Sequence, residues 1–109
     1  MQFSEYQKKA IGFAVYPSQG NNYSYPALGV TAEAGEVVNK IKRVIRDKDG
    51  VMSQEDKEDI GAEIGDVLWY LATLATELGQ SLADIAQHNL DKLQGRKDRG
   101  TLHGSGDIR

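Results

Sequence analysis

The chain has 109 residues, no cysteine and a formal net charge of −3. This length supplies one domain, and the lack of cysteine excludes a disulfide framework and a thiolate zinc site. No apolar run reaches the roughly 18 to 20 residues that cross a bilayer. The acidic balance argues against a nucleic-acid polymer as partner, because such binders carry a basic field. We therefore expect a cytoplasmic protein with no membrane partner.

Turn and capping residues divide the chain into four helical segments, and no segment shows the alternation of a β-strand. The predicted helices span residues 4–15, 27–48, 54–78 and 82–95. Ser4, Ser53 and Ser81 are the predicted N-caps, and Pro17 stops the first helix. We expect an all-α fold in which residues 1–95 form a four-helix bundle completed by oligomerisation. Residues 96–109 form a glycine-rich, partly basic tail that is expected to be loosely ordered.

The third predicted helix carries its apolar residues on one face. They are Ile60, Ile64, Val67, Leu71, Leu74, Ala75 and Leu78. At about 100° per residue, Trp69 falls nearly opposite the centre of this stripe. Because aromatic residues are enriched where subunits meet, we predict a subunit interface at Trp69. An exposed position and a position covered by the same chain are the alternatives.

Two predicted helices contain nearly the same heptapeptide, at residues 32–38 and 62–68. Residues three apart are neighbours on a helix, so Glu33 and Glu36 match Glu63 and Asp66 in position. Antiparallel packing brings the four carboxylates to one rim, where they repel one another unless a cation lies among them. The predicted ion is Mg²⁺, with Mn²⁺ as a substitute, because both ions take carboxylate and water ligands.

The carboxylates have two other interpretations. A solvated acidic face explains either pair alone, but the repetition in matching phase favours a metal site. A di-iron centre requires Glu-x-x-His on two helices. Neither His88 nor His103 follows a glutamate at that spacing, so the sequence does not predict iron.

The fourth predicted helix offers groups that suit phosphate. Asn89 interrupts its apolar face, and Lys92 and Arg96 flank the same side. A buried amide needs hydrogen-bond partners, and the two cations suit phosphate oxygens. The alternative is a helix end whose basic residues favour the C-terminal dipole. Tyr70 lies one turn after Asp66, where it either contacts a sugar or base or packs at the rim.

These motifs resemble the MazG-like family of all-α nucleoside triphosphate pyrophosphohydrolases. The likeness rests on Glu-x-x-Glu at 33–36, Glu-x-x-Asp at 63–66 and Asn-x-x-Lys at 89–92, and the end at 102–107 is similar to short phage-type members. It implies a Mg²⁺-dependent hydrolase that cleaves a (d)NTP to (d)NMP and pyrophosphate. It further implies a homodimer or dimer of dimers, with sites completed by neighbouring subunits.

The resemblance also implies roles for individual side chains. The metal ligands would be Glu33, Glu36, Glu63 and Asp66, and the substrate contacts would be Asn89, Lys92 and Arg96, with Tyr70 near the sugar. In-line attack of water at the α-phosphorus needs a general base, for which Glu36 and Glu63 are the candidates. Phosphoribosyl-ATP pyrophosphohydrolase is a related alternative, and a non-catalytic helical interaction module is an unrelated one.

Overall fold

The computed structural model describes all 109 residues and contains four α-helices and no strand. The helices are α1 (Phe3–Ile11), α2 (Ser24–Lys48), α3 (Gln54–Glu77) and α4 (Leu82–Asp98). The predicted all-α class is therefore confirmed. None of the four helices combines the length and the apolar character needed to cross a membrane.

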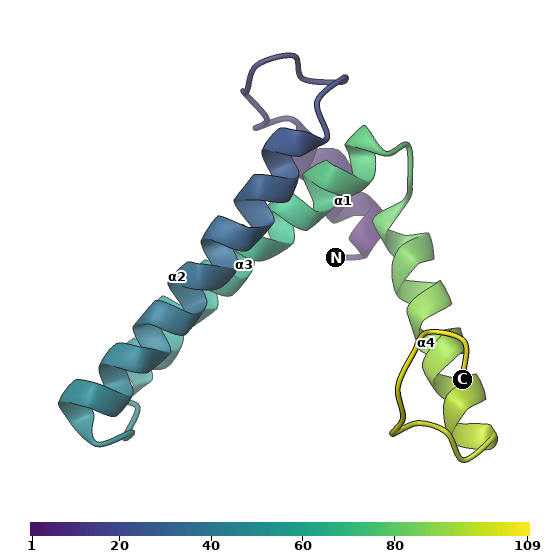
Figure 1. Cartoon of the computed structure of the whole chain (residues 1–109). Helices are drawn as coiled ribbons and strands as arrows, with labels where there is room; N and C mark the ends of the chain where they lie inside the picture. The colour runs from purple at the N-terminus through teal and green to yellow at the C-terminus, as the bar shows by residue number, and fades with distance from the viewer.

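Helices α2 and α3 form a long antiparallel hairpin (Figure 1). Asp49 and Gly50 end α2 with positive φ angles of 52° and 77°, the left-handed conformation that commonly terminates a helix. Ser53 is the N-cap of α3, as predicted, and it forms a reciprocal capping box with Asp56. Its hydroxyl accepts from the Asp56 N–H at 3.1 Å, and the Asp56 carboxylate accepts from the Ser53 N–H at 2.9 Å. These short-range contacts fix the turn and the alignment of the two helices.

Helix α1 packs across α3, against the flank that faces away from α2 (Figure 1). Ala10 and Ala72 are buried in this contact together with Leu82. Trp69 packs against them, and its indole N–H donates to the Ala10 carbonyl at 3.0 Å. Trp69 is thus packed within its own chain, which was the alternative to the predicted subunit interface at this residue. The helical wheel assigned α3 one buried face, whereas the helix is central and buries two.

The first helix differs from its prediction at both ends. It begins at Phe3, and the N-cap residue Gln2 makes no side-chain capping bond, so the predicted N-cap at Ser4 is wrong. It ends at Ile11, four residues before the predicted Val15. The N–H groups of the next three residues, Gly12 to Ala14, donate to carbonyls three residues back, which is the pattern of turns and not of a continued α-helix.

The loop between α1 and α2 is fastened by one carboxylate of α3. Glu77 accepts from the Tyr16 hydroxyl, from the Gly20 N–H at 2.8 Å and from the Asn22 N–H at 3.1 Å. The Tyr16 ring stacks on Tyr25 with 4.9 Å between centroids. These contacts hold the beginning of α2 close to α3. Helix α2 starts at residue 24, three residues before its predicted start.

Helix α4 runs away from the hairpin (Figure 1), touching α1 and α3 but not α2. Gln7 of α1 fixes its start, because the side-chain oxygen accepts from the Leu82 N–H at 2.8 Å and the amide donates to the Gln80 carbonyl at 2.9 Å. Ser81 caps the helix as predicted, but the helix continues to Asp98 and does not stop near Gly95. Arg96 therefore belongs to the helix.

A single chain leaves this bundle open. Its radius of gyration is 16.9 Å, against about 13 Å for a compact domain of this length. Its accessible surface is 7784 Å², about 1,800 Å² more than the roughly 6,000 Å² of a folded monomer of this mass. Several apolar residues of α2, α3 and α4 stay exposed, namely Val38, Ile45, Ile64, Leu71, Leu78, Leu90 and Leu93. One chain therefore does not cover all the apolar faces that its sequence presents.

Candidate functional site

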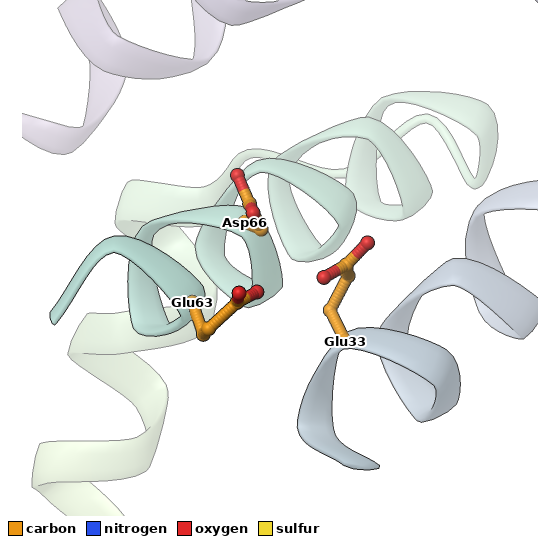
Figure 2. A group of neighbouring side chains, drawn as sticks. All are labelled: Glu33, Glu63 and Asp66. Carbon is orange, nitrogen blue, oxygen red and sulfur yellow. The ribbon is translucent and has the colours of Figure 1, made fainter. Parts of the chain in front are cut away.

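Three of the four predicted carboxylates meet between α2 and α3 (Figure 2). Glu33 projects from α2, and Glu63 and Asp66 project from successive turns of α3. One oxygen from each carboxylate lies within 4.8 Å of the others. Glu33 and Glu63 are half-buried, whereas Asp66 is exposed. The antiparallel hairpin thus produces the juxtaposition that the paired heptapeptides predicted.

The electrostatics of the group are uneven. Burial raises the pKa of Glu33, and the neighbouring charges of Asp66 and Glu63 raise it further. In contrast, the Lys40 ammonium lowers the pKa of Glu63. The Lys40 Nζ lies 3.0 Å from Glu63 Oε1 and also donates to the Asp59 carbonyl at 3.3 Å. One cation therefore offsets part of the acidic charge, and the remaining repulsion falls chiefly on Glu33.

From the sequence alone, Lys40 is expected to be an ordinary surface residue. Its contact with Glu63 was missed, although a signal exists in the spacing. Lys40 follows Glu33 by seven residues, which is close to two helical turns, so both side chains lie on the same face of α2.

Glu36, the fourth predicted carboxylate, lies outside the group of three. It is exposed on α2, although its charge still contributes to the raised pKa values of Glu33 and Lys40. The helix places it three residues beyond Glu33, on the flank turned further from α3. Its predicted role as a metal ligand or general base stays a prediction.

Tyr70 lies beside the carboxylates, in the position that the sequence predicted. A Cβ built on Gly29 of α2 would lie 2.6 Å from Tyr70 Cγ, so the ring rests directly on the backbone of α2. Trp69 meets the ring edge-on with 4.9 Å between centroids. Burial raises the pKa of the Tyr70 hydroxyl, and the nearby Tyr25 and Glu33 raise it further. Gly29 was overlooked in the sequence, although a glycine inside a helix is a signal of close approach.

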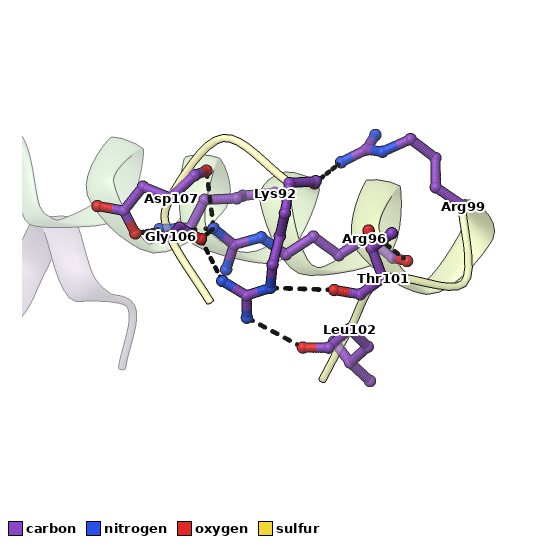
Figure 3. A network of polar contacts seen from close by, with 8 residues as sticks. Lys92, Arg96, Arg99, Thr101, Leu102, Gly106 and Asp107 are labelled. Atoms are coloured by element: carbon purple, nitrogen blue, oxygen red, sulfur yellow. Dashed lines mark hydrogen bonds and ion pairs between the residues drawn. The ribbon is translucent and has the colours of Figure 1, made fainter. Parts of the chain in front are cut away.

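The three predicted substrate contacts on α4 do not reach the carboxylates of the same chain. Asn89 is exposed, in contrast to the buried amide that its place in the apolar face suggested. Lys92 has its Nζ 3.9 Å from Asp107 Oδ1. Arg96 is buried, and its Nη2 donates to the Asp107 carbonyl at 2.8 Å (Figure 3). Because α4 does not touch α2, one chain contains the carboxylates and these groups as two separate sets.

The tail after α4 folds back along the helix (Figure 3), although it was expected to be loosely ordered. The Arg109 guanidinium donates to the carbonyls of Thr101, Leu102 and Gly106. Arg99 in turn donates to the Arg109 carbonyl at 2.7 Å. The sequence did not predict these contacts, because an arginine that binds backbone carbonyls leaves no side-chain motif.

Comparison with known proteins agrees with the carboxylate pattern. A family profile described as "MazG nucleotide pyrophosphohydrolase domain" matches residues 24–101. The chain is also similar to "Gene 37 protein" of Mycobacterium phage L5, with 48% identity over an alignment of 114 positions that covers 100% of both chains. No solved structure gives a significant match. The profile spans the carboxylate hairpin and all of α4.

Proposed function

Since this chain belongs to the MazG nucleotide pyrophosphohydrolase family, and is thus a hydrolase of nucleotide phosphoanhydrides, we propose that it cleaves a (d)NTP to (d)NMP and pyrophosphate with Mg²⁺. The observation that carries this proposal is the convergence of Glu33, Glu63 and Asp66 within 4.8 Å. Mn²⁺ is the expected substitute ion.

The donor set suits a hard divalent cation. It consists of carboxylate oxygens alone, which Mg²⁺ and Mn²⁺ prefer. The raised pKa of Glu33 reflects repulsion that a cation at this position would relieve. When bound there, the ion supplies positive charge to the phosphate chain and acidifies a water molecule. Glu33, Glu63 and Asp66 are the residues that would hold it.

The protein side chains around this group have separable tasks. Lys40 holds Glu63 through a 3.0 Å ion pair, so this carboxylate is oriented before substrate arrives. Glu36 forms no ion pair in the chain and stands one turn from Glu33, which leaves it available to accept a proton from the attacking water. Of the two general-base candidates we therefore favour Glu36. Tyr70, fixed against Gly29, forms a wall on which the sugar can pack.

Completion of this site requires a second copy of the chain. Helix α4 diverges from the α2–α3 hairpin and does not contact α2 (Figure 1), so its cations do not reach the carboxylates of their own chain. The excess surface of about 1,800 Å² exceeds the roughly 800 Å² that each partner buries in a standard interface. Leu71 and Leu78 on α3 and Leu90 on α4 supply exposed apolar residues for that contact. A homodimer, alone or paired as a dimer of dimers, brings Asn89, Lys92 and Arg96 of one copy toward the carboxylates of another.

The test is a nucleotide panel with identification of both products. Wild-type protein with Mg²⁺ should release pyrophosphate from at least one (d)NTP, and excess EDTA should abolish the reaction. Glu63→Gln should remove most of the activity, since it deletes a charge from the proposed metal group. Glu55→Gln is the matched control, because it makes the same change at an exposed position of the same helix. Phosphoribosyl-ATP belongs in the panel as the related alternative substrate.

Product identity decides the cleavage position. Release of inorganic phosphate without pyrophosphate would contradict cleavage between the α- and β-phosphates. Equal activity of Glu63→Gln and Glu55→Gln would contradict the proposed metal group even if pyrophosphate were released.

A further inference from the structure

Glu77 is a carboxylate of α3 that lies outside the proposed metal group and takes no part in the proposed reaction. It is half-buried near the end of the helix. One of its oxygens accepts from the Tyr16 hydroxyl and from the Gly20 N–H at 2.8 Å, and the other accepts from the Asn22 N–H at 3.1 Å. Hydrogen bonds to an ionised carboxylate are among the strong ones. Because all three donors belong to the loop between α1 and α2, this one side chain fixes the path of that loop.

Asn22 extends the connection from Glu77 into α2. Its side-chain oxygen accepts from the Tyr25 N–H at 3.1 Å, and its amide donates to the Pro17 carbonyl at 2.7 Å. The loop is therefore joined to the first turn of α2 and is also closed on itself (Figure 1). A change at Glu77 is expected to alter the placement of Tyr25 through these bonds.

Three tyrosine rings lead from this loop toward the proposed metal group. The buried Tyr16 ring stacks on Tyr25, with 4.9 Å between centroids and 9° between the planes. After burial, Tyr25 is the largest cause that raises the pKa of the Tyr70 hydroxyl, through its charge and a hydrogen bond, so these two side chains are neighbours. Tyr25, Gly29 and Glu33 follow one another at intervals of four residues and share a face of α2.

Tyr25 is placed to contact a ligand held at the carboxylates. It remains 41% exposed although Tyr16 covers one face of its ring. It precedes Glu33 by eight residues, which is about 12 Å along the helix axis, and the Tyr70 ring lies between them against Gly29. Tyrosine offers a flat apolar ring and a polar hydroxyl. The nucleoside of a nucleotide whose phosphates are held at Glu33 can pack along this face.

We propose that Glu77 and Tyr16 are positioning residues for the nucleoside part of the substrate, and that Tyr25 is the contact surface which they place. This inference rests on the proposed function for the identity of the ligand as a nucleotide. Glu77 and the Tyr16 hydroxyl act through the loop and do not touch substrate. They hold the loop in one conformation before binding, so less conformational entropy is lost when the nucleoside packs against it.

Calorimetric titration of the full chain in Mg²⁺ with both kinds of reaction product tests this role. The probes are the four common deoxynucleoside monophosphates, which carry a nucleoside, and inorganic pyrophosphate, which does not. Tyr16→Phe keeps the stacked ring and removes only the hydroxyl that donates to Glu77. It should weaken binding of the tightest monophosphate by about fivefold, because the loop must then be ordered on binding, and change the pyrophosphate affinity by less than about twofold.

Tyr23→Phe is the matched control, because it removes the same atom from a tyrosine of the same loop that is 64% exposed. It should leave all affinities within about twofold, as expected for a surface substitution. Glu77→Ala removes all three acceptors and should weaken monophosphate binding more than Tyr16→Phe does. Glu77→Gln keeps one acceptor oxygen and should fall between the wild type and Glu77→Ala.

Steady-state kinetics supply a second readout. Tyr16→Phe and Glu77→Gln should raise the KM for the nucleotide while kcat changes by less than about twofold, the pattern of an interaction made equally in the ground state and the transition state. A fall in kcat with an unchanged KM would contradict a role in placing the nucleoside surface.

Three binding results would each overturn the proposal. The first is a wild type that binds none of the monophosphates. The second is an equal effect of Tyr16→Phe and Tyr23→Phe, which includes the case where Tyr16→Phe lowers only the melting temperature. The third is a parallel loss of monophosphate and pyrophosphate affinity in Tyr16→Phe. Tyr16→Phe decides the result if Glu77→Ala does not fold.

The outcome is separable from that of the hydrolysis assay. A wild type that releases pyrophosphate from a nucleotide, but whose variants show none of these differences, retains the proposed function without the positioning role. A wild type whose monophosphate binding depends on Tyr16 and Glu77, but which cleaves no nucleotide, retains the nucleoside surface and loses the proposed reaction.

Discussion

Gly29→Ala is expected to destabilise the contact between α2 and Tyr70, although alanine is the better helix former. A Cβ at this position would lie 2.6 Å from Tyr70 Cγ, and even nearer to other ring atoms. The ring cannot recede freely, because Trp69 packs against it at a centroid distance of 4.9 Å. The substitution must therefore move either the ring or the helix.

The magnitude follows from two opposing effects. Replacing glycine by alanine inside a helix gains up to about 1 kcal/mol. Overpacking a fitted contact costs about 1–3 kcal/mol. The net loss for Gly29→Ala is then about 0–2 kcal/mol. Gly61→Ala is the matched control, since a Cβ at Gly61 of α3 has no atom within 4 Å, and it should gain about 1 kcal/mol.

Urea unfolding followed by circular dichroism measures both variants at one fixed protein concentration. The decisive comparison repeats Gly29→Ala in a Tyr70→Ala background, where the obstructing ring is absent. There the substitution should become stabilising by about 1 kcal/mol, so the two changes are strongly coupled. An equal loss in both backgrounds would refute the assignment of the cost to Tyr70.

Three further outcomes follow from contacts described above. Trp69→Phe should cost about 1 kcal/mol, because it removes the hydrogen bond to Ala10, and sedimentation should show an unchanged oligomer; dissociation would instead place Trp69 between subunits. Leu71→Glu should shift the sedimenting species toward monomer by charging an exposed apolar face, and an unchanged sedimentation coefficient would contradict that interface. The ion pair with Lys48, together with hydrogen bonds from Ser53, lowers the Asp56 pKa from 3.8 to about 2. Because this folded-state pKa is depressed, the stabilisation is present above pH 3.8 and is lost as the pH falls toward 2. The melting temperatures of wild type and Asp56→Asn should therefore differ at pH 7 and converge near pH 2; a constant gap would argue against this ion pair.

The features that were predictable from the sequence arise from contacts between near neighbours. Ser53 and Asp56 form their capping box within one turn, so their roles follow from local chemistry. The gathering of Glu33, Glu63 and Asp66 needed only one more assumption, that two adjacent amphipathic helices pack antiparallel. This pairing is the simplest way to bury two apolar stripes joined by a short turn.

The features that escaped prediction depend on contacts between distant segments. Trp69 was misplaced because a helical wheel does not show that a short α1 covers the second face of α3. Arg96 was expected to lie beyond the end of the fourth helix, whereas α4 continues through it and the tail buries it. Asn89 was expected to be buried because it lies on the apolar face of its helix, but it is exposed. A helical wheel does not show the direction in which α4 leaves the hairpin, and this direction leaves α4 without contact to α2.

The tail is held to α4 through its backbone carbonyls, so its amino-acid sequence can vary widely without loss of these contacts. Arg96 and Arg109 recognise main-chain carbonyls at Leu102, Gly106 and Asp107, which nearly any residue type would present in the same place. These hydrogen bonds are therefore retained when a substitution in the tail preserves the path of its backbone. Gly106 is an exception, because its φ of 84° disfavours other residues. Natural or engineered variants can thus exchange most side chains of this segment while its attachment to α4 persists.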